Sequence, residues 1–207
     1  MQDTQTKIGL MSDRIHAMRQ MRERTLVAIA GAPGSGKSTI ANELARRLNL
    51  QKCKTVVVPM DGFHLDNAVL DTLGLLPRKG APETFDVRSF VHLIKRLQAR
   101  DHVYAPAFDR NRDLSVAGAI DVPPDVPVVI VEGNYLMFDE PVWNVLPGLW
   151  DLTVRLDVPM TELRARLIQR WLSQNLSRAA ATRRAESNDI PNAERTIHKA
   201  LPCEINV

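Results

Sequence analysis

One eight-residue segment, GAPGSGKS from Gly31 to Ser38, constrains this chain more than any other feature. It fits the pattern G-x-x-x-x-G-K-[ST], in which glycines let the backbone curl so that its amides converge on phosphate oxygens. The apolar run over 25–30 predicts a buried strand before it, and residues 38–48 have the pattern of a helix after it. The segment therefore predicts a phosphate-binding loop at the positive N-terminal end of a helix.

The loop pattern also assigns chemistry to single residues. Lys37 is expected to reach the β- and γ-phosphates of ATP, and the Ser38 hydroxyl is expected to bind Mg²⁺. The predicted nucleotide-binding residues are Gly31, Gly34, Ser35, Gly36, Lys37, Ser38 and Thr39. The alternative is a glycine-rich turn that binds no nucleotide, although a random chain of this length carries the pattern only about one time in a hundred.

Strand-like and helix-like segments alternate along the chain. Short apolar runs predict strands over 25–30, 56–58, 128–131 and 152–156, with a weaker terminal strand over 204–207. Amphipathic patterns predict helices over 12–23, 38–48, 87–99, 161–175 and 178–186. This alternation predicts an α/β fold, a parallel five-stranded sheet with helices on both faces. We expect one domain over residues 1–207, with an N-terminal helical arm over 1–24 and a lid region at about 160–190.

Two segments leave alternatives open. The helix over 12–23, with Ser12 as its cap, packs on the domain or serves as a partner-binding arm; apolar helical stripes usually face a core. Residues 63–86 are rich in glycine, proline and charge, which predicts a long loop or a lid-like insertion.

Composition narrows the classes of partner. The 207 residues carry a net charge of +3, and no dense basic block is interleaved with aromatic residues, so we do not expect nucleic-acid binding. Cys53 and Cys203 have no metal-like spacing and suggest a reducing compartment. No signal peptide or membrane-spanning run is visible. We expect a cytoplasmic protein that binds small molecules and no membrane, with a homodimer left open.

Two carboxylates follow predicted strands. Asp61 comes after the strand over 56–58, and Glu132 comes directly after the strand over 128–131. Ligands of open α/β sheets bind at the carboxyl ends of the strands, so both should lie near the phosphate loop. Asp61 is the candidate base that accepts a hydroxyl proton, and Glu132 is a candidate for Mg²⁺, through water. The alternative is that both are turn residues.

Four further segments carry a resemblance to a known family. They are PMDGFHL at 59–65, RKGAPETFD at 78–86, YAPAFD at 104–109 and VEGNYL at 131–136. In this order they resemble the phosphoribulokinase, uridine kinase and pantothenate kinase family of P-loop kinases, from about Thr25 to Asn192. Within the family the chain looks closest to short bacterial proteins labelled fructose-transport-system or nucleoside-kinase-like. The resemblance implies a P-loop kinase fold with a small lid, ATP and Mg²⁺ as cofactors, and Asp61 as the base.

The resemblance also implies roles for arginines and for the acceptor site. Arg166 and Arg170, one helical turn apart, match the lid arginines that contact the transferring phosphate; solvated arginines are the alternative. The predicted acceptor residues are Asp61, Arg78, Lys79, Asp86, Tyr104, Phe108 and Arg110. The chain is shorter than pantothenate kinases and lacks the Asp-Asp-Phe-Tyr segment of uridine kinases.

These observations predict an ATP-dependent kinase that phosphorylates a hydroxyl of a small metabolite. A fructose-like sugar, a nucleoside or a pantothenate-like compound is the expected acceptor. The chain has no Asn-Lys-x-Asp guanine-reading motif and no Leu-Ser-Gly-Gly transporter signature. The alternative is a nucleotide-binding regulator or assembly ATPase that has no small-molecule acceptor.

Overall fold

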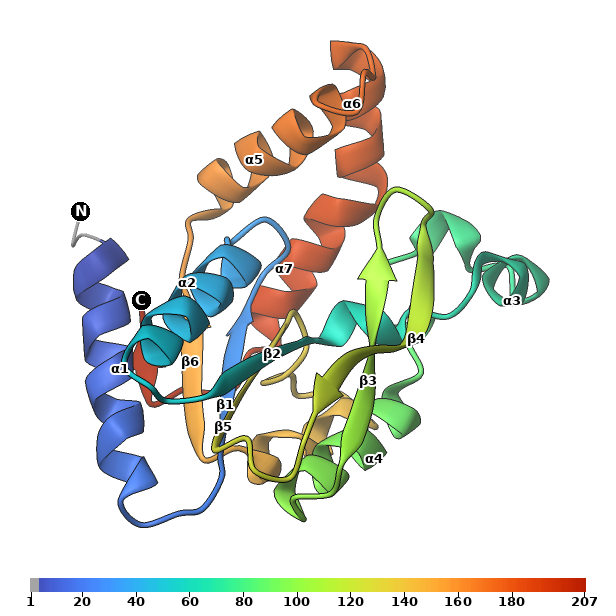
Figure 1. Cartoon of the computed structure of the whole chain (residues 1–207). Coiled ribbons are helices and arrows are strands. Elements are labelled where there is room, and N and C mark those ends of the chain that lie inside the picture. Colours follow the sequence, from blue (N-terminus) through green and yellow to red (C-terminus); the bar gives the residue numbers. More distant parts are fainter. Residues whose placement is uncertain (1–3) are drawn as a thin grey trace.

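The computed structural model describes residues 4–207, and a parallel sheet of five strands lies at its centre (Figure 1). The strands, in the order β2-β5-β1-β6-β7, are β2 (Thr55–Pro59), β5 (Val128–Gly133), β1 (Thr25–Gly31), β6 (Leu152–Leu156) and β7 (Ile205–Asn206). Every residue of β1 is buried, which explains its uninterrupted apolar sequence. The predicted five-stranded parallel sheet is confirmed, and the phosphate loop follows its middle strand.

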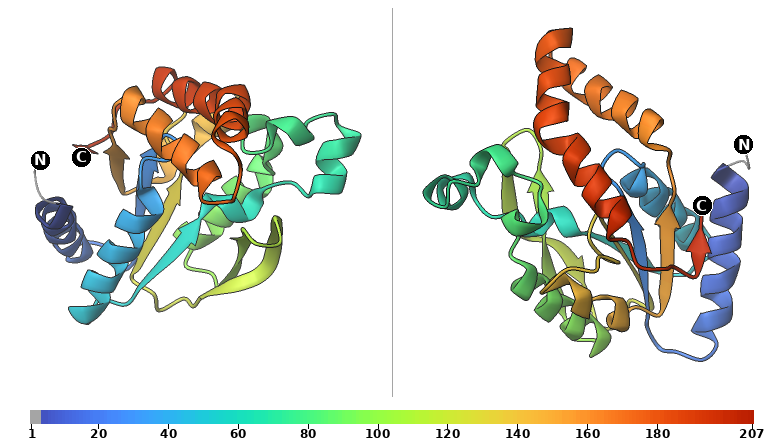
Figure 2. Two further views of the ribbon diagram at one scale, coloured as in Figure 1. Left: turned by 90° about the horizontal axis from the view of Figure 1, so that it is seen from above. Right: turned by 180° about the vertical axis from the view of Figure 1, so that it is seen from behind.

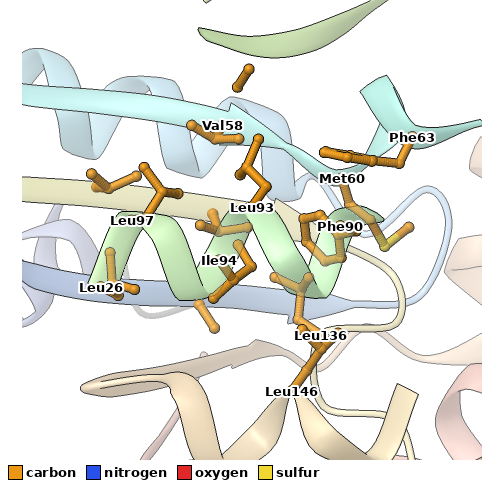
Figure 3. Close-up of a cluster of buried hydrophobic side chains, with 14 of the residues drawn as sticks. Leu26, Val58, Met60, Phe63, Phe90, Leu93, Ile94, Leu97, Leu136 and Leu146 are labelled. Atoms are coloured by element: carbon orange, nitrogen blue, oxygen red, sulfur yellow. The ribbon is translucent and has the colours of Figure 1, made fainter. Parts of the chain in front are cut away.

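Helices cover both faces of this sheet (Figures 1 and 2). On one face, α1 (Thr4–Arg19) and α2 (Lys37–Leu50) pack against alternate residues of β1 and β5. On the other face, α4 (Val87–Gln98) packs Phe90, Ile94 and Leu97 into a cluster that also holds Met60 (Figure 3). Met60 is fully buried, and it anchors the backbone directly before Asp61.

The N-terminal helix differs from its prediction over 12–23. α1 begins at Thr4 and ends at Arg19, so residues 1–3 of the predicted arm lie outside the described residues. Its buried face consists of Ile8, Met11 and Ile15, whereas Met21 is 83% exposed. Ser12 is not a cap: it is buried inside the helix and donates a hydrogen bond to the Gln51 side chain at 3.0 Å. The apolar stripe of the helix starts at Ile8, before Ser12, and it packs against α2 and β1 of the domain.

The segment 63–86 is an insertion of short helical turns. It contains the end of a 3₁₀ turn (Met60–Phe63), α3 (Asn67–Thr72) and two further 3₁₀ turns, Leu76–Arg78 and Pro82–Thr84. Its two ends meet, because the Leu65 amide donates to the Thr84 carbonyl and the Asp86 amide donates to the Phe63 carbonyl. Such closed ends give a compact surface loop a fixed base.

A two-stranded antiparallel hairpin, absent from the predicted elements, lies beside the sheet. It consists of β3 (Val103–Asp109) and β4 (Leu114–Val122), and its register shifts between Ala105 and Ala107. Pro106 in the middle of the first strand explains this irregularity, because proline cannot donate to the ladder. The pairing of β3 with β4 brings the turn at residues 110–113 toward the carboxyl end of β2, where Arg110 contacts Asp61.

Three helices follow β6. They are α5 (Met160–Leu172), α6 (Arg178–Arg184) and α7 (Ile190–His198), with a π-helical turn at Ala185–Asp189. α5 and α6 lie at the top of the molecule in Figure 1, and α7 runs back down toward the sheet. Leu163 and Leu167 of α5 pack with Ala32 of the phosphate loop and with Ile190. The helices predicted over 161–175 and 178–186 are present, whereas α7 was not predicted. None of the helices described here is long and apolar enough to cross a membrane.

Candidate active site

The phosphate loop joins β1 to α2 and presents free amides. Gly34 and Gly36 have positive φ angles of 80° and 94°, a backbone conformation in which any residue with a side chain would be strained. Gly36 precedes α2, and no side chain caps that helix. The first amides of α2 therefore lack an intrahelical partner, which is the arrangement that binds phosphate.

Lys37 lies buried inside the loop. Its Nζ donates to the Ala32 carbonyl at 3.0 Å and to the Ser35 Oγ at 3.4 Å. No carboxylate of the described residues lies within ion-pair distance of it. Burial lowers the pKa of Lys37 to about 8, against the opposing attraction of Glu132 and Asp61. A buried ammonium without a carboxylate partner fits a bound phosphate, which would supply the missing negative charge.

The predicted metal residues are in contact. The Ser38 Oγ donates to Glu132 Oε1 at 3.0 Å, across the carboxyl ends of β1 and β5. Glu132 is only 6% exposed, and burial raises the pKa of its carboxyl group. Among residues 4–207, no group of three or more acidic, histidine or cysteine side chains gathers to hold a metal. These two oxygen ligands fit Mg²⁺, which takes much of its coordination from phosphates and water.

Strand register brings Asp61 to the same edge. β2 pairs with β5 so that Pro59 lies opposite Glu132, and the chain then turns through the 3₁₀ segment that contains Asp61. The Asp61 carboxylate is partly exposed and pairs with Arg110 of the hairpin turn at 3.1 Å. One cavity of about 330 Å³ is lined by Lys37, Ser38, Asp61 and Glu132, among others.

The two predicted lid arginines differ in their surroundings. Arg166 donates to the Gly34 and Ser35 carbonyls at 3.1 and 3.2 Å and pairs with Glu162. Both arginines line the phosphate-loop cavity, and the Arg170 guanidinium lies 5.8 Å from the Trp171 ring. Arg166 is therefore held by the loop backbone and by Glu162, whereas no carboxylate of residues 4–207 lies within ion-pair distance of Arg170.

A second cavity of about 420 Å³ adjoins the first. Both cavities are lined by Pro33, Asp61, Arg110, Asn134 and Arg170. The second extends between the hairpin turn, the 63–86 insertion and the helices after β6. Phe108 and Lys79 also line it, and the Lys79 Nζ lies 5.0 Å from the centre of the Phe108 ring.

Three predicted acceptor residues do not line these two cavities. Asp86 caps α4 by accepting the Ser89 amide hydrogen bond at 3.0 Å. Arg78 pairs with Glu83 at 2.9 Å. The exposed Tyr104 stacks on His102 near the start of β3. The other four predicted acceptor residues, Asp61, Lys79, Phe108 and Arg110, line the second cavity.

Three further residues, Asn134, Trp171 and Arg184, line the second cavity. Asn134 and Trp171 are not predicted site residues, and the sequence suggests Arg184 only as one of several arginines of the 178–186 helix that close over ATP or stay solvated. Asn134 follows Glu132 by two residues, and its side chain has no hydrogen-bond partner within residues 4–207. Its place just beyond a strand end was a usable signal. Trp171 had none, and no signal in the sequence directs Arg184 to the second cavity, because both positions depend on how α5, α6 and α7 pack together.

Comparison with known proteins agrees with this geometry. The model of the phosphoribulokinase/uridine kinase family matches residues 26–190. The crystal structure of a candidate fructose transport system kinase from Silicibacter sp. TM1040 has a TM-score of 0.91 and 48% identity, covering 97% of this chain and 98% of that one.

Two curated relatives add to this comparison. YggC of Escherichia coli K12, a protein named as uncharacterised, is 36% identical over 178 residues, or 85% of this chain and 74% of its own. A uridine kinase of Ureaplasma urealyticum is 30% identical over 150 residues, covering 72% of this chain and 70% of that protein. With a family match over most of its length and a kinase-type phosphate loop, this chain belongs to the phosphoribulokinase/uridine kinase family.

Proposed function

We propose that this protein is an ATP-dependent kinase that transfers the γ-phosphoryl group of ATP·Mg²⁺ to a hydroxyl of a small metabolite. The observation that carries the proposal is the cavity lined jointly by Lys37, Ser38, Asp61 and Glu132. A phosphate loop alone promises only a bound nucleotide. Asp61, a partly exposed carboxylate that lines both this cavity and the second one, would supply what transfer to an alcohol requires, a group that accepts the hydroxyl proton.

Each side chain would perform one part of the transfer. The loop amides and Lys37 hold the phosphates, while Ser38 and Glu132 position Mg²⁺, which neutralises phosphate charge when bound. Asp61 orients the acceptor hydroxyl and takes its proton as the oxygen bonds to the γ-phosphorus. The bond from that phosphorus to the bridging oxygen breaks, and ADP leaves with the electron pair. Arg170 stabilises charge on the group in transfer.

The pairing of Asp61 with Arg110 describes the site before the acceptor binds. A carboxylate that accepts from a guanidinium has one oxygen occupied, so the acceptor hydroxyl would take the other oxygen or displace Arg110. Arg110 lies on the hairpin turn, so movement of that turn would free Asp61 without any change in the main sheet.

The acceptor class is drawn from the relatives. Their names include uridine kinase, pantothenate kinase and fructose transport system kinase. We therefore place the acceptor among nucleosides, sugars and pantothenate-like compounds, all of which have a free hydroxyl group.

Release of ADP from ATP·Mg²⁺ tests the proposal. It should be measured alone and then with a panel of sugars, nucleosides, pantothenate and sugar phosphates. We expect slow release without acceptor and a large stimulation by one class. Release that no compound stimulates would instead favour a nucleotide-binding regulator or assembly ATPase.

A further inference from the structure

The second cavity is lined by a charged side chain, Arg184, that has no role in the proposed phosphoryl transfer. One wall of the second cavity is formed by α6, the π-helical turn and α7, and it contributes Arg184, Asp189 and Asn192. None of these three residues lines the phosphate-loop cavity. Residues five apart stack on one face of a π-helical turn. The turn therefore lets Arg184 and Asp189 face the same space, on the side of the cavity away from the phosphate loop.

Arg184 is held in place while part of its guanidinium stays available. Its guanidinium lies 5.1 Å from the Trp171 ring, and its Nη1 donates to the Pro77 carbonyl at 3.3 Å. No carboxylate of the described residues lies within ion-pair distance of it. A guanidinium has five N–H donors in a planar fork, so several remain for a ligand.

The other charges around the cavity are accounted for by neighbours. Lys79 pairs with Asp113 at 3.0 Å and also donates to the Asn67 side chain. Arg110 pairs with Asp61, and Asp189 accepts a hydrogen bond from the Trp171 indole at 2.5 Å. Arg170 belongs to the phosphate-loop cavity as well. Arg184 is thus the one cation, among the described lining of this outer part, that has neither an acidic partner nor a role in the transfer.

A buried amide lines the same wall. Asn192 is 3% exposed, and its Nδ2 donates to the Asn188 Oδ1 at 3.2 Å. Asn188 is fixed in turn, because its own amide donates to the Lys79 carbonyl at 2.8 Å. The Asn192 Oδ1 accepts no hydrogen bond from residues 4–207, and it is not among their buried unpaired atoms, so it is accessible at the cavity wall. An amide oxygen that lines a cavity and has no protein partner can accept a hydrogen bond from a ligand, so it suits a hydroxyl group.

We infer that the acceptor is a small polyhydroxylated compound with one anionic group, a phosphate or a carboxylate. Arg184 binds the anionic group, Asn192 accepts a hydrogen bond from a second hydroxyl, and Asp61 receives the reacting hydroxyl. A guanidinium fork suits both anions, because each presents two oxygens in a plane. This inference rests on the proposed kinase function and narrows its substrate class.

The test compares matched acceptors on three proteins. Neutral sugars, sugar phosphates and sugar acids are each offered with saturating ATP·Mg²⁺ to the wild type, Arg184→Gln and Arg183→Gln. Arg183 is the exposed neighbour on α6 and does not line either cavity, so it controls for the loss of one charge. Phosphorylation of sugar phosphates or of sugar acids identifies which anion is recognised.

We expect an anionic class to be phosphorylated in preference to the neutral sugars. Arg184→Gln should raise the KM for that acceptor about 10- to 100-fold, the loss expected for one charge-assisted hydrogen bond, and leave the KM for ATP unchanged. Arg183→Gln should behave as the wild type. Calorimetric binding of the acceptor and a thermal unfolding curve for each variant separate lost binding from lost folding.

Three results would overturn the inference in different ways. A neutral acceptor that is used best and is insensitive to Arg184→Gln would remove the anion site and leave the kinase function standing. An increase in the KM for ATP would reassign Arg184 to the nucleotide. If no compound accepts phosphate and ATP is only hydrolysed, the proposed function fails first, and the acceptor class fails with it.

Discussion

At the scale of single residues, Lys37 combines charge with burial. Its ammonium has only a carbonyl and a hydroxyl as direct partners, and its pKa is lowered to about 8. Folding disfavours the protonated form of Lys37. The free energy of unfolding therefore increases as the pH rises from about 8, the pKa in the folded protein, to 10.5, the ordinary pKa of lysine. Phosphate binding requires the positive charge of Lys37, and the folded protein loses this charge over the same pH range.

We therefore predict that the free protein binds ATP more weakly above pH 8. The dissociation constant should rise by up to about tenfold per pH unit, because one proton is linked to binding. Calorimetry with a non-hydrolysable ATP analogue at pH 7, 8 and 9 measures this change. Lys37→Arg provides the control: it stays charged throughout, so its weaker binding should not change near pH 8. A flat profile in the wild type would contradict the assignment of the charge to Lys37.

At the scale of elements, the hairpin and the Asp61 turn lie in close contact. A Cβ at position 62 would lie 2.4 Å from the Pro106 carbonyl oxygen, which belongs to the backbone of β3 and cannot rotate away. Gly62 is therefore required for the approach of these two elements. That approach also sets the distance between Asp61 and Arg110.

Gly62→Ala should displace the hairpin and lower kcat/KM for the acceptor more than it lowers nucleotide affinity. We expect a cost of about 1–3 kcal/mol in unfolding free energy, as for other overpacked sites. Denaturant unfolding and steady-state kinetics measure the two effects. Gly148→Ala is the matched control, because a Cβ at position 148 meets no atom within 4 Å. Equal behaviour of the two variants would show that the close contact has no consequence for the site.

At the scale of the whole molecule, the sequence predicted the part of the site that the sheet builds. Lys37, Ser38 and Glu132 follow buried strands, and strand ends in a parallel sheet converge whatever the rest of the chain does. Asp61 came from the same rule. The metal and nucleotide roles of these residues remain predictions, although the structure brings their side chains together.

The acceptor side depended on tertiary packing and was harder to predict. Asp86 occupies a position before a helix where an aspartate also serves as a cap, and the structure shows that cap. The hairpin carries a proline inside one strand and lacks a two-residue turn signal, so no strand was predicted there. The wall that holds Arg184 and Asn192 depends on a π-helical turn, which local sequence patterns do not signal.

Asp61, the carboxylate at the end of β2, is the residue to which we assign transfer of phosphate to a metabolite. The most direct measurement incubates the protein with isotope-labelled ATP and a small-molecule extract, and follows the label by mass spectrometry. The wild type should transfer the label to an organic hydroxyl compound. Asp61→Asn should lower kcat for that product by about 10²–10⁴ while binding ATP nearly normally. Asp125→Asn, which removes an exposed aspartate paired with Lys54, should leave transfer unchanged. Label found only in inorganic phosphate, or near-normal transfer by Asp61→Asn, would contradict this account.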